Sequence, residues 1–296
     1  MTSPVGPWSG VAAEVRVASR RLIRARWFAG VTIVSIAAST AVLAAMFAVA
    51  SSTDLRHLSY DPGGRLSVLY TRHDSSSSAP GEDGPGFSYS AFTDYRLRAR
   101  SFGRLEAVSL VNKRPDVNGV PGDAILGHAA TPGFLSMLGV RPAAGRWFTS
   151  DDTLAGTPRV VVLSYAYWSA SYGAEAGLVG KRIMLRDRFP AGAPPVAYTV
   201  IGILPRDFIW DQRNTVWIPM SRDEPQTRAS ITPIGVLRAD IALSVATDEG
   251  RAIAGDLADV LDLSRPPGDK MLGGHLTIQA TSWRTYVHER VGGASA

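Results

Sequence analysis

The chain has 296 residues, of which 45% are hydrophobic and 19% are charged; its formal net charge is +5, and it has no cysteine. This length and composition are typical of a globular protein with one large or two smaller domains. The lack of cysteine excludes disulfide bonds, thiolate metal sites, iron–sulfur clusters and cysteine nucleophiles. Most of the positive charge precedes residue 27, where five arginines face one glutamate. About +1 therefore remains for the rest of the chain, and we expect no nucleic-acid binding.

A long uncharged segment follows these arginines. Residues 27–53 carry no formal charge, and residues 27–50 in an α-helix would span ~36 Å, more than the ~30 Å core of a bilayer. We therefore expect a transmembrane helix at 27–50, with residues 1–26 in the cytoplasm and 51–296 outside. The alternative is a cleaved secretory signal ending at the small residues 48–50. The length of the apolar segment and of its leader disfavours that alternative.

Two sets of residues are expected to position this helix. The residues predicted to anchor it at the inner membrane surface are Arg20, Arg21, Arg24, Arg26 and Trp27. The residues predicted to let a second helix approach closely are Ala37, Ala41, Ala45 and Ala48, although this spacing also arises simply because alanine is common in the chain. Residues 11–24 alternate apolar residues and arginines at helical spacing. They are expected to form an amphipathic helix on the membrane, with a solvated tail as the alternative.

Strands and helices then alternate along the chain. The expected strands are residues 65–71, 103–111, 123–131, 158–164, 181–187, 197–205, 215–220, 234–246 and 275–281. Between the first strand and the first helix, residues 73–86 are polar and of low complexity, and we expect a mobile loop there.

Four helices are expected between these strands, and most have a capping signal. Ser88 precedes a helix at 89–100, and Ser164 precedes one at 165–172 that Gly173 ends. Thr131 is expected to cap a short helix, with Pro132 at its first position and Gly139 just past its end. The fourth helix covers 248–262 and presents one apolar side formed by Ile253, Leu257, Val260 and Leu261.

This order of elements predicts an α+β fold with two lobes. A strand, helix and strand occur at both ends of the outer region, and a strand-rich block lies between them. We expect an outer split lobe made of about 51–139 and 231–296. The lobe inserted into it would cover about 140–230.

The sequence contains no pattern specific for catalysis or metal binding. It lacks a phosphate-binding loop, a G-x-S-x-G nucleophile motif and any histidine pair at metal-ligand spacing. His128 is the best-placed histidine, and Asp151 with Asp152 is the best carboxylate pair. Adjacent acids in such a segment are more simply turn and helix-start residues. Ser136 and Ser164 fit helix and cap positions. We therefore expect no catalytic residue, no metal and no cofactor.

The tryptophans of the outer region have a structural explanation. Trp147, Trp168, Trp210 and Trp217 are expected to be core or interface aromatics rather than a cation-binding cage.

Several segments in their order resemble a known family. These are the motif GFLSMLGVRPAAGRWFTSDD at 133–152, the segment 160–187, the motif YTVIGILPRDF at 198–208 and the motif VWIPM at 216–220. Together they resemble the extracytoplasmic core domain of MacB/FtsX-type ABC transporter permeases, and more narrowly the duplicated orphan permeases abundant in acidobacteria. The resemblance covers nearly the whole chain, including the basic lead-in and the apolar segment.

The resemblance implies a mechanical function in the bacterial inner membrane. In such permeases a cytoplasmic ABC ATPase binds later membrane helices and drives motion of the outer domain, which acts on substrates or envelope partners and has no catalytic residues. This sequence ends without those later helices, so we expect a truncated or split permease that uses a partner. The alternative is a single-pass anchored binding or scaffold domain without transport. An envelope hydrolase is a third, weaker alternative.

Overall fold

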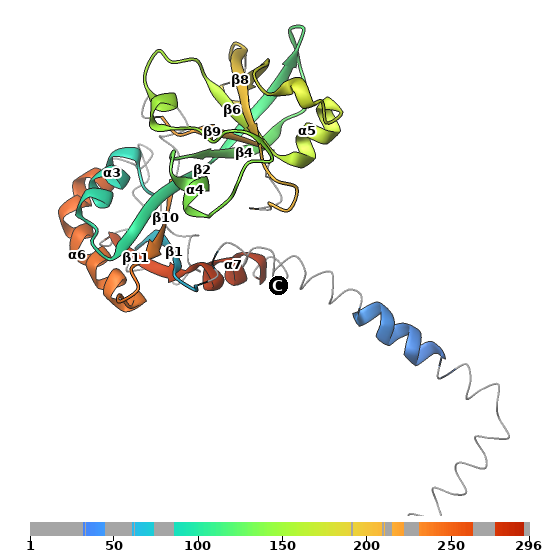
Figure 1. The fold of residues 1–296 in the computed structure, drawn as a ribbon. Helices are drawn as coiled ribbons and strands as arrows, with labels where there is room; N and C mark the ends of the chain where they lie inside the picture. The colour runs from blue at the N-terminus through green and yellow to red at the C-terminus, as the bar shows by residue number, and fades with distance from the viewer. Residues whose placement is uncertain are drawn as a thin grey trace, which may run out of the picture. The chain divides into compact units, whose positions relative to one another are not determined.

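The computed structural model describes residues 32, 34–44, 61, 63–73, 86–190, 192–208, 210, 215–221, 231–262 and 276–292 (Figure 1). The chain divides into two compact units, Met1–Leu55 and Arg56–Ala296, and each is described by itself.

The first unit contains a helix at 34–44. Ser39 Oγ and Thr40 Oγ1 each donate to the backbone carbonyl four residues earlier, at 2.8 Å, so both hydroxyls are satisfied within the helix itself. Within the residues that the structure describes, no helix is both long enough and apolar enough to cross a membrane. The predicted transmembrane helix is therefore not confirmed. Ala37 and Ala41 lie in the described helix, whereas Ala45, Ala48 and the predicted anchors Arg20, Arg21, Arg24, Arg26 and Trp27 lie outside the described residues.

The second unit is built on one eleven-stranded sheet. Its strands are β1 Leu66–His73, β2 Phe102–Val117, β3 Val120–Pro121, β4 Ile125–Ala130, β5 Ala144–Gly145, β6 Val160–Leu163, β7 Arg182–Asp187, β8 Val196–Ile203, β9 Val216–Pro219, β10 Thr232–Leu237 and β11 Leu276–Ser282. Its helices are α3 Tyr89–Arg98, α4 Phe134–Met137, α5 Tyr165–Tyr172, α6 Leu243–Asp262 and α7 Trp283–Gly292, with 3-10 turns at Ser150–Thr153 and Ala176–Leu178.

Part of this sheet closes on itself. The strands β2, β4, β9, β6 and β8 pair in that order, and β7 pairs with both β8 and β2. These six strands therefore form a closed cylinder, whose interior is filled by residues such as Val111, Val161, Leu185 and Tyr198.

The rest of the sheet is open and shares β2 with the cylinder. The first half of β2 pairs with β10, which continues to β1 and β11, and the second half pairs with β4 and β7 (Figure 1). Helices α3 and α6 pack side by side on one face of this open part, where they bury Phe92, Tyr95, Ile253 and Ala254. The mixed α+β class is confirmed. The predicted lobe boundaries remain a prediction. Strand β2 runs through both the open sheet and the cylinder.

The predicted helix signals at α3 and α5 are confirmed. Ser88 Oγ accepts a hydrogen bond from Ala91 N at 3.1 Å, and Ser164 Oγ accepts one from Tyr167 N at 3.1 Å. Gly173 ends α5 in the left-handed conformation, with φ of 59°. These caps depend on residues within one helical turn, which is why local sequence was enough to predict them.

The predicted cap of α4 is wrong. Gly133 is the N-cap residue and makes no side-chain cap, so Thr131 and Pro132 precede the helix. The Thr131 hydroxyl instead donates to Glu106 and accepts from Ala107 N. The Glu106 carboxylate, from a distant part of the chain, thus binds the Thr131 hydroxyl that the local sequence pattern had assigned to the helix cap. Gly139 does follow the end of α4 with a φ of 71°, as predicted.

The long strand predicted at 234–246 is also wrong. Strand β10 ends at Leu237, and α6 begins at Leu243. The apolar run around Leu243 fits a strand or a buried helix equally well by composition. Burial of Ala246, Ile253 and Ala254 against β11 decides for the helix. The predicted apolar positions Leu257, Val260 and Leu261 lie outside the described side chains, and most of the predicted loop at 73–86 lies outside the described residues.

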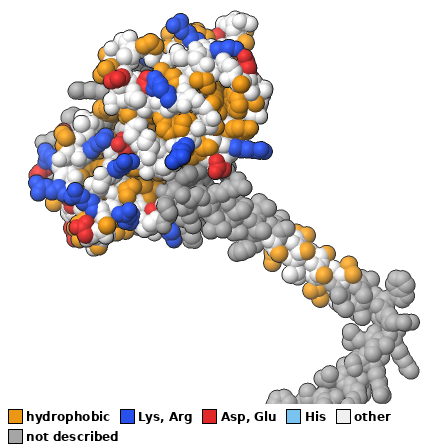
Figure 2. All heavy atoms as spheres, in the orientation of Figure 1, with side chains coloured by type: hydrophobic (Ala, Val, Ile, Leu, Met, Phe, Trp, Pro, Cys, Tyr) orange, Lys and Arg blue, Asp and Glu red, His pale blue; other side chains and the backbone are white. Residues whose placement is uncertain are grey.

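Hydrophobic side chains gather on one region of the surface. Figure 2 shows them on the face around α5, between scattered charged groups. None of the α5 residues is fully buried, and its aromatic residues are half-buried: Tyr165, Tyr167, Trp168 and Tyr172. Tyr167 and Trp168 pack against the interior of the cylinder. Trp168 is therefore a packing residue, as predicted.

Candidate functional site

The first and last strands of the second unit are paired neighbours. Ser67, near the start of β1, lies opposite Ser282, the last residue of β11, and α7 follows at once. Asp61 fixes the entry because its Oδ1 accepts hydrogen bonds from Arg65 N at 2.8 Å and Leu66 N at 2.9 Å. Ser282 Oγ accepts from Thr285 N at 3.1 Å and so caps the exit helix.

Five aromatic residues connect the exit helix to the cylinder, and we call them the aromatic stack. They are Phe134 of α4, Trp210, Trp217 of β9, and Trp283 and Tyr286 of α7. The Trp210 and Trp283 rings stack with centroids 4.6 Å apart and planes 21° apart. Trp210 also meets the edge of Phe134 at 5.1 Å, and Phe134 stacks on Trp217 at 5.8 Å. All five are buried, so Trp210 and Trp217 are core aromatics, as predicted.

This arrangement couples α7 to the cylinder through rigid contacts. Offset and edge-on aromatic pairs contribute about 0.5–1.5 kcal/mol each beyond their area burial. Packed aromatic rings also transmit small displacements, because a close-packed interior has few voids to absorb them. Trp210 therefore contacts the rings of Trp283 in α7, Phe134 in α4 and Trp217 in β9.

A second connection lies where β2 passes from the open sheet into the cylinder. The buried Glu106 carboxylate accepts a hydrogen bond from Thr131 Oγ1 at 2.5 Å and pairs with Arg96 Nη2 at 3.2 Å. Arg96 comes from α3 and Thr131 follows β4, so one carboxylate joins three elements. A Cβ at position 133 would lie 2.2 Å from Glu106 Oε1, so a larger residue there would displace this carboxylate. A pocket of about 490 Å³ next to Glu106 is lined in part by Arg104 and Ser136.

A buried lysine lies inside the cylinder. Lys113 is 1% exposed; its Nζ donates to Asp187 Oδ1 at 2.8 Å and to Tyr198 Oη at 3.1 Å. Arg159 donates to the same Tyr198 hydroxyl at 3.2 Å. Burial alone would lower the pKa of Lys113, but Tyr198 and Asp187 together raise it above the ordinary lysine value. Lys113 is therefore charged at neutral pH and holds β2, β7 and β8 together.

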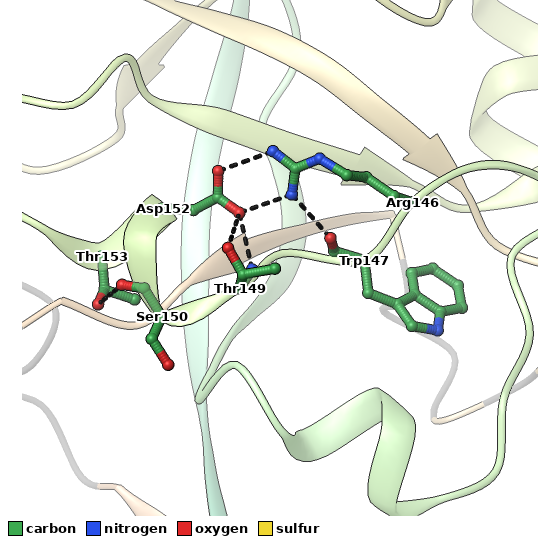
Figure 3. A network of polar contacts seen from close by, with 6 residues as sticks. All are labelled: Arg146, Trp147, Thr149, Ser150, Asp152 and Thr153. Carbon is green, nitrogen blue, oxygen red and sulfur yellow. Dashed lines mark hydrogen bonds and ion pairs between the residues drawn. The ribbon is translucent and has the colours of Figure 1, made fainter.

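The corner between α4 and β6 contains the predicted acid pair, of which Figure 3 shows Asp152. Asp152 forms a two-point contact with Arg146, with Nη1 to Oδ2 at 2.7 Å and Nη2 to Oδ1 at 2.9 Å. Its Oδ2 also accepts from Thr149 N at 2.7 Å, which caps the 3-10 turn that follows. The hydrogen bond from Arg146 lowers the pKa of Asp152 below its ordinary value, assisted by Thr149 and opposed by burial. Asp152 is thus a turn residue, as predicted. Asp151 is exposed in the same turn.

Replacement of Asp152 by alanine should destabilise this corner. We expect the free energy of unfolding at neutral pH to fall by about 1 kcal/mol, the usual effect of losing such a cap. Because the folded-state pKa of Asp152 is depressed, its contribution is present above the ordinary value of 3.8 and is lost as pH falls through the lower folded value. Denaturant unfolding at neutral and acidic pH measures both effects. Asp151→Ala is the matched control and should change little; an equal loss in both variants would contradict the assignment.

The other residues considered for chemistry have structural roles. His128 is buried in β4, where its ring lies 4.6 Å from that of Trp217. Ser164 caps α5, and Ser136 lies in α4 at the pocket beside Glu106. Trp147 donates from Nε1 to Val140 O at 2.7 Å and so fixes the corner. Over the described part of the chain, His, Asp and Glu side chains form no group of three or more that could hold a metal ion.

Sequence reasoning missed three residues that organise the second unit. Lys113 and Glu106 lie in the long strand β2, where charged side chains among apolar neighbours were the available signal. Trp283 begins α7, a helix not predicted from the sequence. Its partner Trp210 is far away in the chain, so no local pattern connects the two.

The fold and these connections define an α+β domain whose first and last strands, β1 and β11, lie side by side. A comparison with family models identifies the particular family. Residues 29–259 match the MacB-like periplasmic core domain, and the chain belongs to that family. It matches none of the curated proteins with which it was compared.

Two solved structures are similar to this chain. The periplasmic region of MacB from Actinobacillus actinomycetemcomitans is similar with a TM-score of 0.51 at 13% identity, over 79% of this chain and 95% of that one. The extracellular domain of the noncanonic ABC-type transporter YknZ from Gram-positive bacteria gives a TM-score of 0.48 at 15% identity, over 73% of this chain and all of that one. The first of these supports the same fold.

Proposed function

We propose that the chain is part of an ABC transporter permease whose outer domain couples ATP hydrolysis by a cytoplasmic partner subunit to export or to remodelling of the cell envelope. The observation that carries this proposal is the pairing of Ser67 with Ser282, which brings the entry and exit of the outer domain together. A domain with this geometry can be inserted between two membrane segments and moved by either. Membership in the MacB-like family supports the same function.

The aromatic stack gives the coupling a physical route. A displacement at the start of α7 acts on Trp283, which transfers it to Trp210 and then to Phe134 at the cylinder. Two-state repacking of such contacts is a common way in which small movements become larger ones. We further propose that the domain is not an enzyme. The support is that Asp152, Ser164 and His128 already have structural partners.

We also propose the membrane arrangement predicted from the sequence. In it residues 1–26 are cytoplasmic, 27–50 cross the inner membrane once and 51–296 are periplasmic. The charge pattern supports this orientation, because arginines precede the uncharged segment.

Measurement of ATP hydrolysis in a reconstituted complex tests the proposed function. The full-length chain is co-expressed with an ABC ATPase and with the remaining permease helices encoded beside its gene, purified in neutral detergent and returned to lipid. We expect the ATPase to co-purify, its rate to depend on the chain, and Trp283→Ala to reduce that dependence at least several-fold. Trp168→Ala, which lies outside the stack, should leave it unchanged. If the ATPase neither co-purifies nor responds, the anchored binding or scaffold domain is the better description.

A further inference from the structure

The outer surface of the cylinder carries a basic sheet face. Residues alternate along β7, so that Ile183 and Leu185 point into the cylinder and Arg182, Met184 and Arg186 lie on its outer side. The register of β2 with β7 places Arg114 directly opposite Arg186. Arg188 extends the same row, since its backbone N–H donates to Asn112 O at 3.1 Å. We call Arg114, Arg182, Arg186 and Arg188 the arginine face.

The positive charge of this face is only partly neutralised. Among the described residues 110–117 and 182–188, one acidic side chain lies on this side, Asp116, and it pairs with Arg186. Asp187 points to the other side of the sheet, where it pairs with Lys113. Arg114 and Arg186 occupy directly opposite positions, an arrangement that is unfavourable for like charges. Arg182 and Arg188 are exposed, so an added acidic group can reach them and offset the positive charge of the face.

Apolar side chains lie among these arginines. Leu110 is 46% exposed, Met184 37% and Phe189 70%. The Arg188 guanidinium lies over the Phe189 ring, 5.1 Å from its centroid. Arginine, methionine and aromatic residues are the types enriched where proteins bind one another. The combination of arginines with exposed apolar side chains distinguishes the arginine face from an ordinary solvent-exposed charged surface.

We propose that the arginine face docks an extended acidic segment of an envelope protein. Alternate residues of an extended segment lie about 6.7 Å apart, the same spacing as the outer-side positions 182, 184 and 186 along β7. Guanidinium groups bind carboxylates in two-point geometry, which gives orientation as well as attraction. The apolar residues provide the contacts that a purely phosphate-bearing ligand does not use. This inference rests on the proposed function in one respect: the proposed membrane arrangement places the arginine face in the periplasm.

A binding measurement with a defined probe tests the proposal. The probe is a labelled peptide of alternating glutamate and threonine with a leucine near each end, added to the full-length chain in neutral detergent. We expect saturable binding that weakens as salt is raised, because salt screens exposed charges. The same peptide with glutamine in place of glutamate should bind much more weakly.

Charge reversal at the exposed arginines should remove this binding. Arg182→Glu combined with Arg188→Glu is expected to weaken the affinity about tenfold or more, since each change replaces attraction by repulsion. Arg186 is retained because its loss would leave Asp116 unpaired, and Arg114→Gln tests the centre of the face with less risk to folding. Arg251→Glu is the matched control: its side chain is 55% exposed on α6, and its replacement should change the affinity by less than about twofold.

Three results would overturn the proposal. They are the absence of saturable binding, an equal loss in the Arg251→Glu variant, and displacement of the peptide by short-chain phosphatidylglycerol below its micellar concentration. The last would identify a lipid phosphate as the occupant. ATP hydrolysis by the reconstituted complex is measured on the same variants. If ATPase coupling is present but no peptide binds, the docking site alone is rejected. If the wild-type chain shows no ATPase coupling, the proposed function is rejected.

Discussion

Replacement of Trp283 by alanine is expected to lower the free energy of unfolding of the chain by about 3–5 kcal/mol. The indole is almost fully buried between Trp210 and Tyr286, so its removal leaves a cavity as well as losing apolar burial. Natural domains are stable by only about 5–15 kcal/mol, and a large part of that margin would be lost. Guanidinium unfolding of the full-length chain in neutral detergent, followed by near-UV circular dichroism, measures the change.

Two further variants test whether the loss of stability comes from the aromatic stack rather than from removal of any tryptophan. Trp283→Phe keeps an aromatic ring against Trp210, and we expect it to lose clearly less stability than the alanine variant. Trp168→Ala removes an equally large side chain that is half-buried on α5, and its loss should also be smaller. A loss below about 1 kcal/mol for Trp283→Ala would show that α7 is not fixed to the cylinder by this ring.

The parts of the fold that were predictable from sequence are those decided by neighbouring residues. Ser88, Ser164 and Gly173 delimit α3 and α5 by hydrogen bonds and a backbone conformation within one turn. Strands β7 and β8 were predictable because two apolar runs flank a proline- and glycine-rich connection. The corner around Asp152 was predictable for the same reason, since all its partners lie between residues 146 and 152.

The features that escaped prediction depend on residues far apart in the chain. Thr131 fails to cap α4 because Glu106, 25 positions earlier, takes its hydroxyl. Closure of the cylinder depends on the pairing of β2 with β7, for example Lys113 with Asp187, and no local pattern specifies that register. The arginine face arises in the same way, because Arg114 and Arg186 become neighbours only when the cylinder closes.

Replacement of Asp187 by asparagine is expected to lower the free energy of unfolding by about 3 kcal/mol. The change leaves the Lys113 ammonium inside the cylinder without its carboxylate, and an unpaired buried charge is strongly destabilising. We place the expected effect at the low end of the usual range because Tyr198 still accepts from Lys113 and Asp187 is itself 26% exposed. Denaturant unfolding at neutral pH measures the difference.

The double variant Lys113→Met with Asp187→Asn tests the cause. Methionine fills a similar volume without charge, so we expect this variant to recover most of the stability lost in Asp187→Asn. If the double variant is no more stable than Asp187→Asn, the loss reflects disturbed packing of β7 rather than an unpaired charge.

The stability contributed by the Lys113–Asp187 pair should fall at high pH. The pKa of Lys113 is raised above 10.5 in the folded chain, so folded Lys113 keeps its proton where the unfolded chain has released it. Its contribution to stability is therefore fully present below about pH 10.5 and is lost as pH rises through the higher folded value. Other groups also titrate in this range, and the difference between wild type and Lys113→Met isolates the lysine. That difference should shrink with rising pH above 10.5; a difference that stays constant would show that Lys113 is not held charged by Asp187 and Tyr198.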